Sequence, residues 1–338
     1  MNGIIMVGER GLTDKELRVG VIGLGKMGLL HASILNTIPN VKTTAVCESK
    51  HLLARFASKA FKDIKIVNSI HGFSKLKLDA VFVSTPIPSH SSVINELYDI
   101  GINNIFTEKT LAANGEESLK ICKLAQKAGG VNMVGYMARF AVPFHKAREL
   151  LKSGVIGDVV SFQCHAYSSD FIGIPEKSHL RGGVLRDLGC HVLDLAMWYF
   201  GELKISDTKV EPALPVNGES NAIFHVTGYN NIEGEFDVSW CREGYRVPDY
   251  GLVIKGTKGS IEVNNDCVKL GLGGKQEIWY RVDMDDNVPF LLGAAEYYRE
   301  DIAFINAILN NNTVEPDFVA ASKVDCFIDQ VKIKAGSV

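Results

Sequence analysis

The sequence lacks long apolar runs and any excess of charge of one sign. No stretch of its 338 residues approaches the roughly 20 apolar residues that a membrane-spanning helix needs. The 36 Lys and Arg residues are balanced by 39 Asp and Glu residues, which gives a formal net charge of −3. Proteins that bind nucleic acid usually carry a basic stripe, and none is present here. The sequence therefore predicts neither a membrane nor a nucleic-acid partner.

Paired cysteines and a leader-like opening are also absent. The seven cysteines are an odd number and contain no C-x-x-C pair, which argues against a zinc ribbon or a thioredoxin-type motif. Most of them lie in apolar segments, where a thiol behaves as a small hydrophobic side chain. Residues 1–11 have neither the basic region nor the cleavage site of a secretory signal peptide. We therefore expect a reduced, cytoplasmic protein.

Short apolar runs alternate with helix-like segments over the first 137 residues. Such alternation predicts a parallel sheet with helices on both faces, and the continuous apolar run at 79–85 is typical of a strand buried on both sides. The expected strands are 17–22, 43–48, 79–85, 103–109 and 131–136, and the expected helices are 26–38, 51–61, 90–101 and 115–130.

The rhythm changes after residue 137. A helix at 142–154 and a strand at 159–169 are followed by strand-like segments from about 205 to 285, separated by Gly and Asn turns, which predict an antiparallel sheet. Two helices, roughly 292–311 and 316–333, close the chain. We expect an α/β protein with domains at 1–137 and 138–338, packed together because no flexible linker separates them. The sequence leaves open whether the last helices return to the first domain.

A glycine-rich turn follows the first predicted strand. Gly23, Gly25 and Gly28 have the spacing G-x-G-x-x-G between an apolar strand and an amphipathic helix, which is the setting of a dinucleotide-binding turn. The turn residues Leu24, Lys26 and Met27 would then lie beside a pyrophosphate at the helix N-terminus. The alternative is a structural glycine turn without a ligand.

Four further positions extend the predicted cofactor site. Glu48 ends the second strand, twenty residues after Gly28, where a carboxylate accepts hydrogen bonds from ribose hydroxyls and repels a 2′-phosphate. We therefore favour NAD over NADP, although Lys50 lies close by. Thr85, Pro86 and His90 lie in the segment STPIPSH (84–90), at the end of the expected strand at 79–85, and are expected at the cofactor edge. An ordinary Pro-rich loop is the alternative.

The segment LRDLGCHVLDL carries three polar residues in an apolar helix. Asp187, His191 and Asp194 have i, i+4 and i+7 spacing, which puts them on one face. Burying a charged group without a partner is costly, so these residues are either satisfied core residues or a reaction site. Cys190 is adjacent to His191, but side chains at adjacent helical positions diverge by about 100° and no nearby Cys or His completes a tetrahedral set. We expect no metal.

The motifs taken together resemble one family. GVIGLGKMGLLHASIL, STPIPSH, TEKTLA, GYMARF and GGVLRDLGCHVLDL occur in this order and are similar to the Gfo/Idh/MocA family of nicotinamide-dependent oxidoreductases. The resemblance implies a Rossmann domain followed by an α/β domain with a large, mostly antiparallel open sheet. That sheet commonly forms an oligomer interface in the family, so a homo-oligomer, a dimer or a tetramer, is expected. Members act on a hydroxyl or carbonyl of a sugar, cyclitol or nucleotide sugar.

The resemblance also implies a catalytic group. The family's E-K-P motif corresponds to Glu108, Lys109 and Thr110, and its D-x-x-x-H motif corresponds to Asp187 and His191. Glu108 and Lys109 then also lie at the cofactor edge. We expect His191 to act as general acid/base, Lys109 to position the reacting oxygen and Asp187 to support them. Thr110 stands where the family has proline. The peptide bond after Lys109, and with it the position of the lysine side chain, is therefore not set by a proline as it is in the family.

Four residues are candidates for substrate binding. Tyr136 and Arg139 lie near the domain junction, His165 lies near a strand end, and Arg181 precedes two glycines. Three of them have an alternative role: a structural ion pair for Arg139, an exposed strand end for His165 and a solvated loop for Arg181.

Three functions fit these residues. The first is an NAD-dependent dehydrogenase acting on a sugar, cyclitol or nucleotide sugar. The second is a closed-cycle enzyme that keeps its NAD(P) tightly bound, such as a sugar–sugar oxidoreductase or an oxidative glycosidase. The third is an NAD-binding regulator without catalysis, which the retention of Lys109, Asp187 and His191 argues against.

Overall fold

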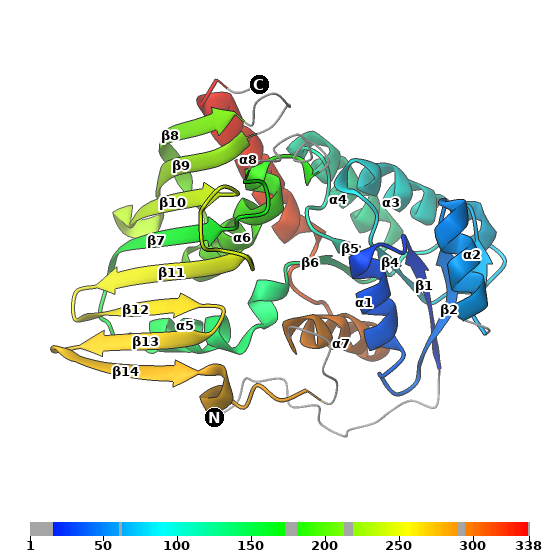
Figure 1. The fold of residues 1–338 in the computed structure, drawn as a ribbon, viewed down its shortest axis with the longest axis horizontal. Coiled ribbons are helices and arrows are strands. Elements are labelled where there is room, and N and C mark those ends of the chain that lie inside the picture. The colour runs from blue at the N-terminus through cyan, green and yellow to red at the C-terminus, as the bar shows by residue number, and fades with distance from the viewer. Residues whose placement is uncertain (1–15, 61–62, 173–180, 213–218, 289–294, 337–338) are drawn as a thin grey trace.

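The computed structural model describes residues 16–60, 63–172, 181–212, 219–288 and 295–336. The opening residues, on which the expectation about a signal peptide depends, lie outside these ranges. Within them, no helix combines the length and apolar character needed to cross a membrane. Figure 1 shows two sheets side by side, with the red C-terminal helix running between them.

The first sheet is parallel and follows the predicted alternation. Its strand order is β3-β2-β1-β4-β5-β6, the order of a classical dinucleotide-binding sheet. Every residue of β4 and β5 is buried because helices cover both faces. The elements are β1 (Leu17–Ile22), α1 (Lys26–Leu35), β2 (Val41–Cys47), α2 (His51–Ala60), β3 (Lys65–Val67), β4 (Ala80–Val83), α3 (His90–Asp99), β5 (Ile105–Glu108), α4 (Gly115–Ala128) and β6 (Asn132–Gly135).

The second sheet has eight strands in the order β14-β13-β12-β11-β7-β10-β9-β8. Only the β7–β10 pair is parallel, so the sheet is mixed and mostly antiparallel. The predicted fold class is therefore confirmed. The elements are η3 (Met137–Phe140), α5 (Val142–Lys152), β7 (Val159–Tyr167), η5 (Leu185–Gly189), α6 (Cys190–Phe200), β8 (Lys204–Pro212), β9 (Glu219–Thr227), β10 (Glu233–Ser239), β11 (Asp249–Gly256), β12 (Gly259–Asn264), β13 (Cys267–Leu272), β14 (Lys275–Tyr280) and η7 (Arg281–Met284).

One face of this sheet packs on helices. Along β7, Phe162, Cys164 and Ala166 are buried, and the Phe162 ring stacks on Phe200 of α6 with 4.2 Å between centroids. Because successive side chains of a strand point to opposite faces, the residues between them lie on the other, outer face. The sheet therefore has a covered inner face and an outer face without a helix among the described elements.

The predicted helix at 185–195 is wrong in one respect. Residues Leu185–Gly189 form a π-helical turn, η5, and the α-helix α6 begins only at Cys190. A π-turn is wider than an α-turn and is frequent at functional sites. Asp187 lies in this turn, whereas His191 and Asp194 lie in α6, so the three do not share one regular helical face as the spacing predicted.

The C-terminal helices pack on both halves of the molecule. α7 (Ala295–Asn310) contacts α1 and η3, and its Phe304 ring meets the rings of Phe82 and Phe106 at centroid distances of 5.4 and 5.9 Å. α8 (Phe318–Lys334) contacts α4 of the first domain and α6 and β8 of the second. The end of the chain thus joins the two sheets.

This packing predicts the effect of truncating Phe304. Its side chain is fully buried, so Phe304→Ala should lower the free energy of unfolding by about 3–5 kcal/mol through lost contacts and a residual cavity. Urea titration followed by fluorescence measures the loss. Asn306→Ala, at an exposed position of the same helix, is the control; equal losses in the two variants would contradict a core role for Phe304.

Candidate active site

The glycine turn has the geometry that a dinucleotide requires. Gly23 has a φ of +87°, and a Cβ on Gly28 would lie 1.8 Å from the carbonyl oxygen of Gly23. A Cβ on Gly25, in contrast, would meet nothing within 4 Å. The turn is therefore closed toward the protein and open toward the N-terminus of α1, where free N–H groups favour a phosphate. These residues fit the pyrophosphate of NAD.

Glu48 lies directly beside this turn. Its carboxylate accepts hydrogen bonds from the backbone N–H groups of Leu24 and Lys50, both at 2.8 Å. This structural role was not anticipated from the sequence. Each carboxylate oxygen can accept a further hydrogen bond, so the contact with ribose hydroxyls stays a prediction.

The segment after β4 divides into two parts. Thr85 and Pro86 lie at the carboxyl edge of the sheet, and Thr85 Oγ1 accepts a hydrogen bond from Ser89 at 2.9 Å. His90 is fully buried, with its ring nitrogens 2.8 Å from the carbonyl oxygens of Thr85 and Thr110. Burial lowers the pKa of His90 despite these contacts. His90 therefore ties two loops together, and its contact with a cofactor stays a prediction.

Lys109 immediately follows β5 and reaches across to the second domain. Its Nζ donates to the Asp187 backbone oxygen at 2.5 Å and to Asp187 Oδ1 at 2.9 Å. Burial alone would lower the pKa of Lys109, but Asp187 outweighs it and the pKa rises. The Lys109–Thr110 peptide bond is cis, although threonine stands in place of the family's proline.

Asp187 is surrounded by donors. Besides Lys109, Arg181 Nη1 at 3.0 Å and Trp240 Nε1 at 3.2 Å donate to Asp187 Oδ2. Burial would raise the pKa of Asp187, but the charges of Lys109 and Arg181 hold it below its usual value. Arg181 also pairs with Asp170 at 3.0 Å. Asp187 is therefore ionised at neutral pH.

His191 is buried next to this ion pair. Its Nδ1 has no hydrogen-bond partner within the described part of the chain. Burial, and next the charge of Lys109, bring the pKa of His191 well below its usual range. The ring lies against Tyr250, with 4.8 Å between centroids, and edge-on to Tyr136 at 6.1 Å. His191 is thus a neutral imidazole that can accept a proton.

Two predicted substrate residues lie elsewhere. Arg139 is buried and donates to both oxygens of Asp194, from Nε at 2.7 Å and from Nη2 at 2.6 Å, so it is an ion-pair residue. His165 lies on the outer face of the second sheet, where its Nε2 is 2.7 Å from Asp249, opposite the face that α6 covers. Both side chains take part in ion pairs within the protein, which is the alternative role given above for Arg139, and their contact with a substrate stays a prediction.

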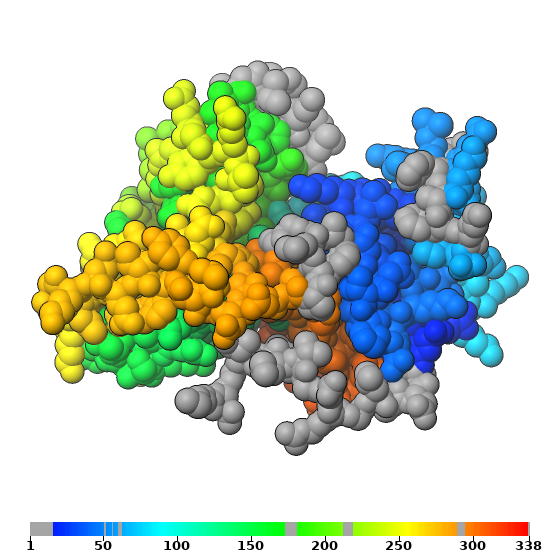
Figure 2. All heavy atoms as spheres, turned by 60° about the horizontal axis from the view of Figure 1, so that its bottom comes forward, coloured from blue at the N-terminus to red at the C-terminus, as the bar shows by residue number. Residues whose placement is uncertain are grey.

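A cleft of about 730 Å³ connects the glycine turn to the second domain. In Figure 2 the blue first domain and the green to orange second domain form two lobes that meet beside α1. The cleft is lined from the first domain by Lys26 and Met27 and from the second by Tyr250. Val247 and Pro248, in the loop before β11, also line the cleft.

Sequence reasoning missed a buried cluster behind Lys109. His31 Nδ1 is 2.8 Å from Asp301, and His31 Nε2 is 3.0 Å from Glu108. The two carboxylates hold the pKa of His31 well above its usual value against the effect of burial. A histidine in the apolar run GLLHASIL was the available signal, but nothing local indicates a partner 270 residues away. Trp240 was missed for the same reason.

Comparisons with known proteins agree with this geometry. Residues 17–136 match a model described as an oxidoreductase family with an NAD-binding Rossmann fold, and residues 144–262 match the GFO/IDH/MocA C-terminal domain. A relative named inositol 2-dehydrogenase, from Rhizobium meliloti, is 26% identical over 74% of this chain and 76% of its own length. A second, 2,7-anhydro-N-acetylneuraminate hydratase from Escherichia coli, is 25% identical over 77% of this chain and 71% of its own.

Solved structures share the fold over nearly the whole chain. Levoglucosan dehydrogenase in complex with NADH and levoglucosan has a TM-score of 0.83 at 21% identity, covering 95% of this chain and 97% of its own. The two matched segments together span both domains in the order that the family has. With its glycine turn, its Lys109 and its D-x-x-x-H segment in place, the chain belongs to the Gfo/Idh/MocA family of NAD-binding oxidoreductases.

Proposed function

We propose that this protein is an NAD-dependent dehydrogenase that transfers a hydride between nicotinamide and a secondary hydroxyl or carbonyl of a sugar, cyclitol or nucleotide sugar. The observation that carries the proposal is the contact of Lys109 with Asp187 next to His191, at the junction of the two domains. Relatives named as inositol and sugar dehydrogenases support the substrate class.

The residues present divide the work of alcohol oxidation. Bound NAD supplies the hydride acceptor. The glycine turn, Glu48 and the Thr85–Pro86 segment would hold it. Neutral His191 takes the hydroxyl proton, while charged Lys109 donates a hydrogen bond to the oxygen and stabilises its developing negative charge. Asp187 keeps Lys109 charged and in place.

Arg181 and Tyr136 remain proposed substrate contacts. Arg181 is half-exposed, bridges Asp170 and Asp187 and lies 5.2 Å over the ring of Phe171. Tyr136 contacts His191 edge-on, and its hydroxyl has no hydrogen-bond partner among the residues described. Tyr136 is therefore next to the group that we assign to proton transfer, and Arg181 is next to Asp187.

We also propose a cytoplasmic homo-oligomer, a dimer or tetramer formed through the outer face of the second sheet. All seven cysteines are free, which fits a reducing compartment. Ile223, on that outer face, is 40% exposed, and a large sheet face of this kind needs a cover. Sedimentation velocity measures the mass; a monomer at micromolar concentration would contradict the proposal.

The closed-cycle alternative has one supporting observation. A relative that matches three quarters of the chain is named a hydratase, and hydration involves no net oxidation. Prolonged dialysis separates the two functions: an enzyme that retains NAD and converts substrate without accumulating NADH follows the closed cycle, and one that needs added NAD is a dehydrogenase.

Replacing His191 tests the assigned base. His191→Ala should reduce kcat by about 10²- to 10⁴-fold, the usual contribution of a general acid/base, and leave NAD affinity within a few-fold. NADH formation is followed at 340 nm over a panel of inositols, aldoses, sugar acids and UDP-sugars, and NAD binding by calorimetry. His71→Ala, at an exposed site, is the control; unchanged turnover in His191→Ala would refute the assignment.

Removing Lys109 tests the electrostatics. The positive charge of Lys109 lowers the pKa of His191, so Lys109→Ala should raise the pKa of His191 while reducing turnover. Carbon-13 NMR of the histidine rings measures the titration, with His71 as an internal reference. A His191 pKa that stays put or falls in this variant would show that the two groups are not coupled.

Neutralising Glu48 tests cofactor choice. Glu48→Gln keeps a hydrogen-bond acceptor for Leu24 N–H but removes the charge that opposes a 2′-phosphate. The preference for NAD over NADP, measured as a ratio of kcat/KM values, should fall by about tenfold or more, equivalent to about 1.4 kcal/mol. Glu16→Gln, outside the site, serves as the matched control. A ratio unchanged from wild type would remove Glu48 from cofactor selection.

A further inference from the structure

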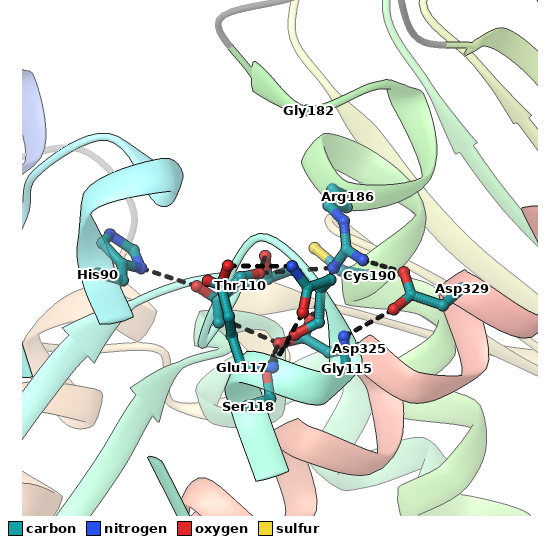
Figure 3. Close-up of polar contacts among 12 residues, drawn as sticks. His90, Thr110, Gly115, Glu117, Ser118, Gly182, Arg186, Cys190, Asp325 and Asp329 are labelled. Carbon is teal, nitrogen blue, oxygen red and sulfur yellow. Dashed lines mark hydrogen bonds and ion pairs between the residues drawn. The ribbon is translucent and has the colours of Figure 1, made fainter. Parts of the chain in front are cut away.

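A buried cluster on α8 joins the two segments that carry Lys109 and Asp187. We call it the Asp325 cluster, and it consists of Ser118, Arg186, Asp325 and Asp329 with the backbone of Ala112 and Gly115. Figure 3 shows Arg186 of η5 and both Asp325 and Asp329 of α8 converging on the loop that follows Thr110. Asp325 is fully buried and Arg186 is 3% exposed.

The first-domain side of the cluster is the loop after Lys109. Asp325 Oδ2 accepts from the backbone N–H of Ala112 at 3.0 Å and from Ser118 Oγ at 2.5 Å. Asp329 Oδ2 accepts from the backbone N–H of Gly115 at 2.6 Å. The chain from Lys109 to Ala112 is three residues long, so these bonds fix the loop immediately behind the lysine.

The second-domain side is the turn that carries Asp187. Arg186 Nη1 donates to Asp325 Oδ1 at 3.3 Å and to the Ala112 carbonyl oxygen at 3.5 Å, and Arg186 Nη2 pairs with Asp329. Arg186 immediately precedes Asp187 in η5. One carboxylate on α8 therefore contacts both the loop of Lys109 and the turn of Asp187.

We propose that Asp325 is a positioning residue that sets the distance between Lys109 and Asp187 by holding the loop of one domain to the turn of the other. The proposal rests on the proposed function, because it assigns Asp325 to the alignment of that site. Asp325 acts through these backbone segments. A displacement of about 1 Å at a reacting group can cost about 10²-fold in rate, so the effect falls on kcat.

The ionisation of Asp325 predicts a pH dependence of activity that can be measured. Burial raises the pKa of Asp325 to about 7, although Arg186 and the hydrogen bonds from Ser118 and Ala112 oppose the rise. The ionised carboxylate pairs with Arg186, and protonation weakens that pair. The ionisable groups facing Asp325 are Arg186 of η5, Cys122 of α4, Cys190 of α6, Tyr136, and Cys326 and Asp329 of α8.

The expected result is a loss of activity as the pH falls through about 7. Burial and the charge of Lys109 lower the pKa of His191, so its protonation is expected at a lower pH than that of Asp325. Lys109 cannot cause this loss, because its pKa is raised.

The test compares Asp325→Asn with Asp317→Asn. Asn keeps an acceptor for Ala112 N–H but loses the charge toward Arg186. Asp317 caps the same helix through Ala320 N–H at 2.7 Å, a role that Asn performs equally well. In Asp325→Asn, kcat should fall by up to about 10²-fold with KM for NAD within threefold, and the inflection near pH 7 should disappear; Asp317→Asn should match wild type. Ser118→Ala removes the hydrogen bonds from the Ser118 hydroxyl to Asp325 and to the Asn114 carbonyl oxygen but keeps the Arg186–Asp325 pair, so it should show a smaller loss of kcat.

A second readout does not depend on turnover. Acetic anhydride labelling of Lys109, followed by mass spectrometry, reports its contact with Asp187. Labelling should increase in Asp325→Asn and not in Asp317→Asn, with thermal melting used to verify folding. If the wild-type protein turns over no substrate but labelling of Lys109 increases in Asp325→Asn, the proposed function fails and the positioning role stands. Unchanged labelling, or an inflection near pH 7 that persists in Asp325→Asn, would overturn the positioning role.

Discussion

The buried ion pair between Lys109 and Asp187 is the constraint on which the site depends. Removing charges from water costs several kcal/mol per ion, and an unpaired buried charge is strongly destabilising. The surrounding residues satisfy this demand: Arg181 and Trp240 complete the shell of Asp187. Because Lys109 comes from the first domain and Asp187 from the second, this pair also links the two domains.

The charge of Lys109 determines what His191 can do. In a buried site, a neighbouring cation opposes protonation, so His191 is neutral and able to accept a proton. The ring is held by contact with Tyr250 and Tyr136, without a hydrogen bond to Nδ1 from any described residue. The His191 ring is thus held by packing, and burial, followed by the charge of Lys109, lowers its pKa.

The C-terminal helices complete both halves of this arrangement. Asp301 of α7 holds His31, which in turn contacts Glu108, the neighbour of Lys109. Asp325 of α8 contacts the loop on the other side of Lys109. The segments on either side of Lys109 are therefore held by buried carboxylates from the last part of the chain, by Asp325 directly and by Asp301 through His31.

The sequence by itself was enough to predict the parallel sheet, the glycine turn, the family and the candidate site residues Lys109, Asp187 and His191. Each of these depends on short motifs and on the order in which they occur along the chain. Tertiary structure decided the partners. Asp194 pairs with Arg139, and His165 faces away from α6. The local sequence around Arg139 and around His165 is compatible with either substrate binding or a structural role. The π-turn at Leu185–Gly189 and the contacts of the Asp301 and Asp325 carboxylates could likewise not be predicted from the sequence. A buried charge requires a partner, but only the folded structure determines which residue lies close enough to pair with it.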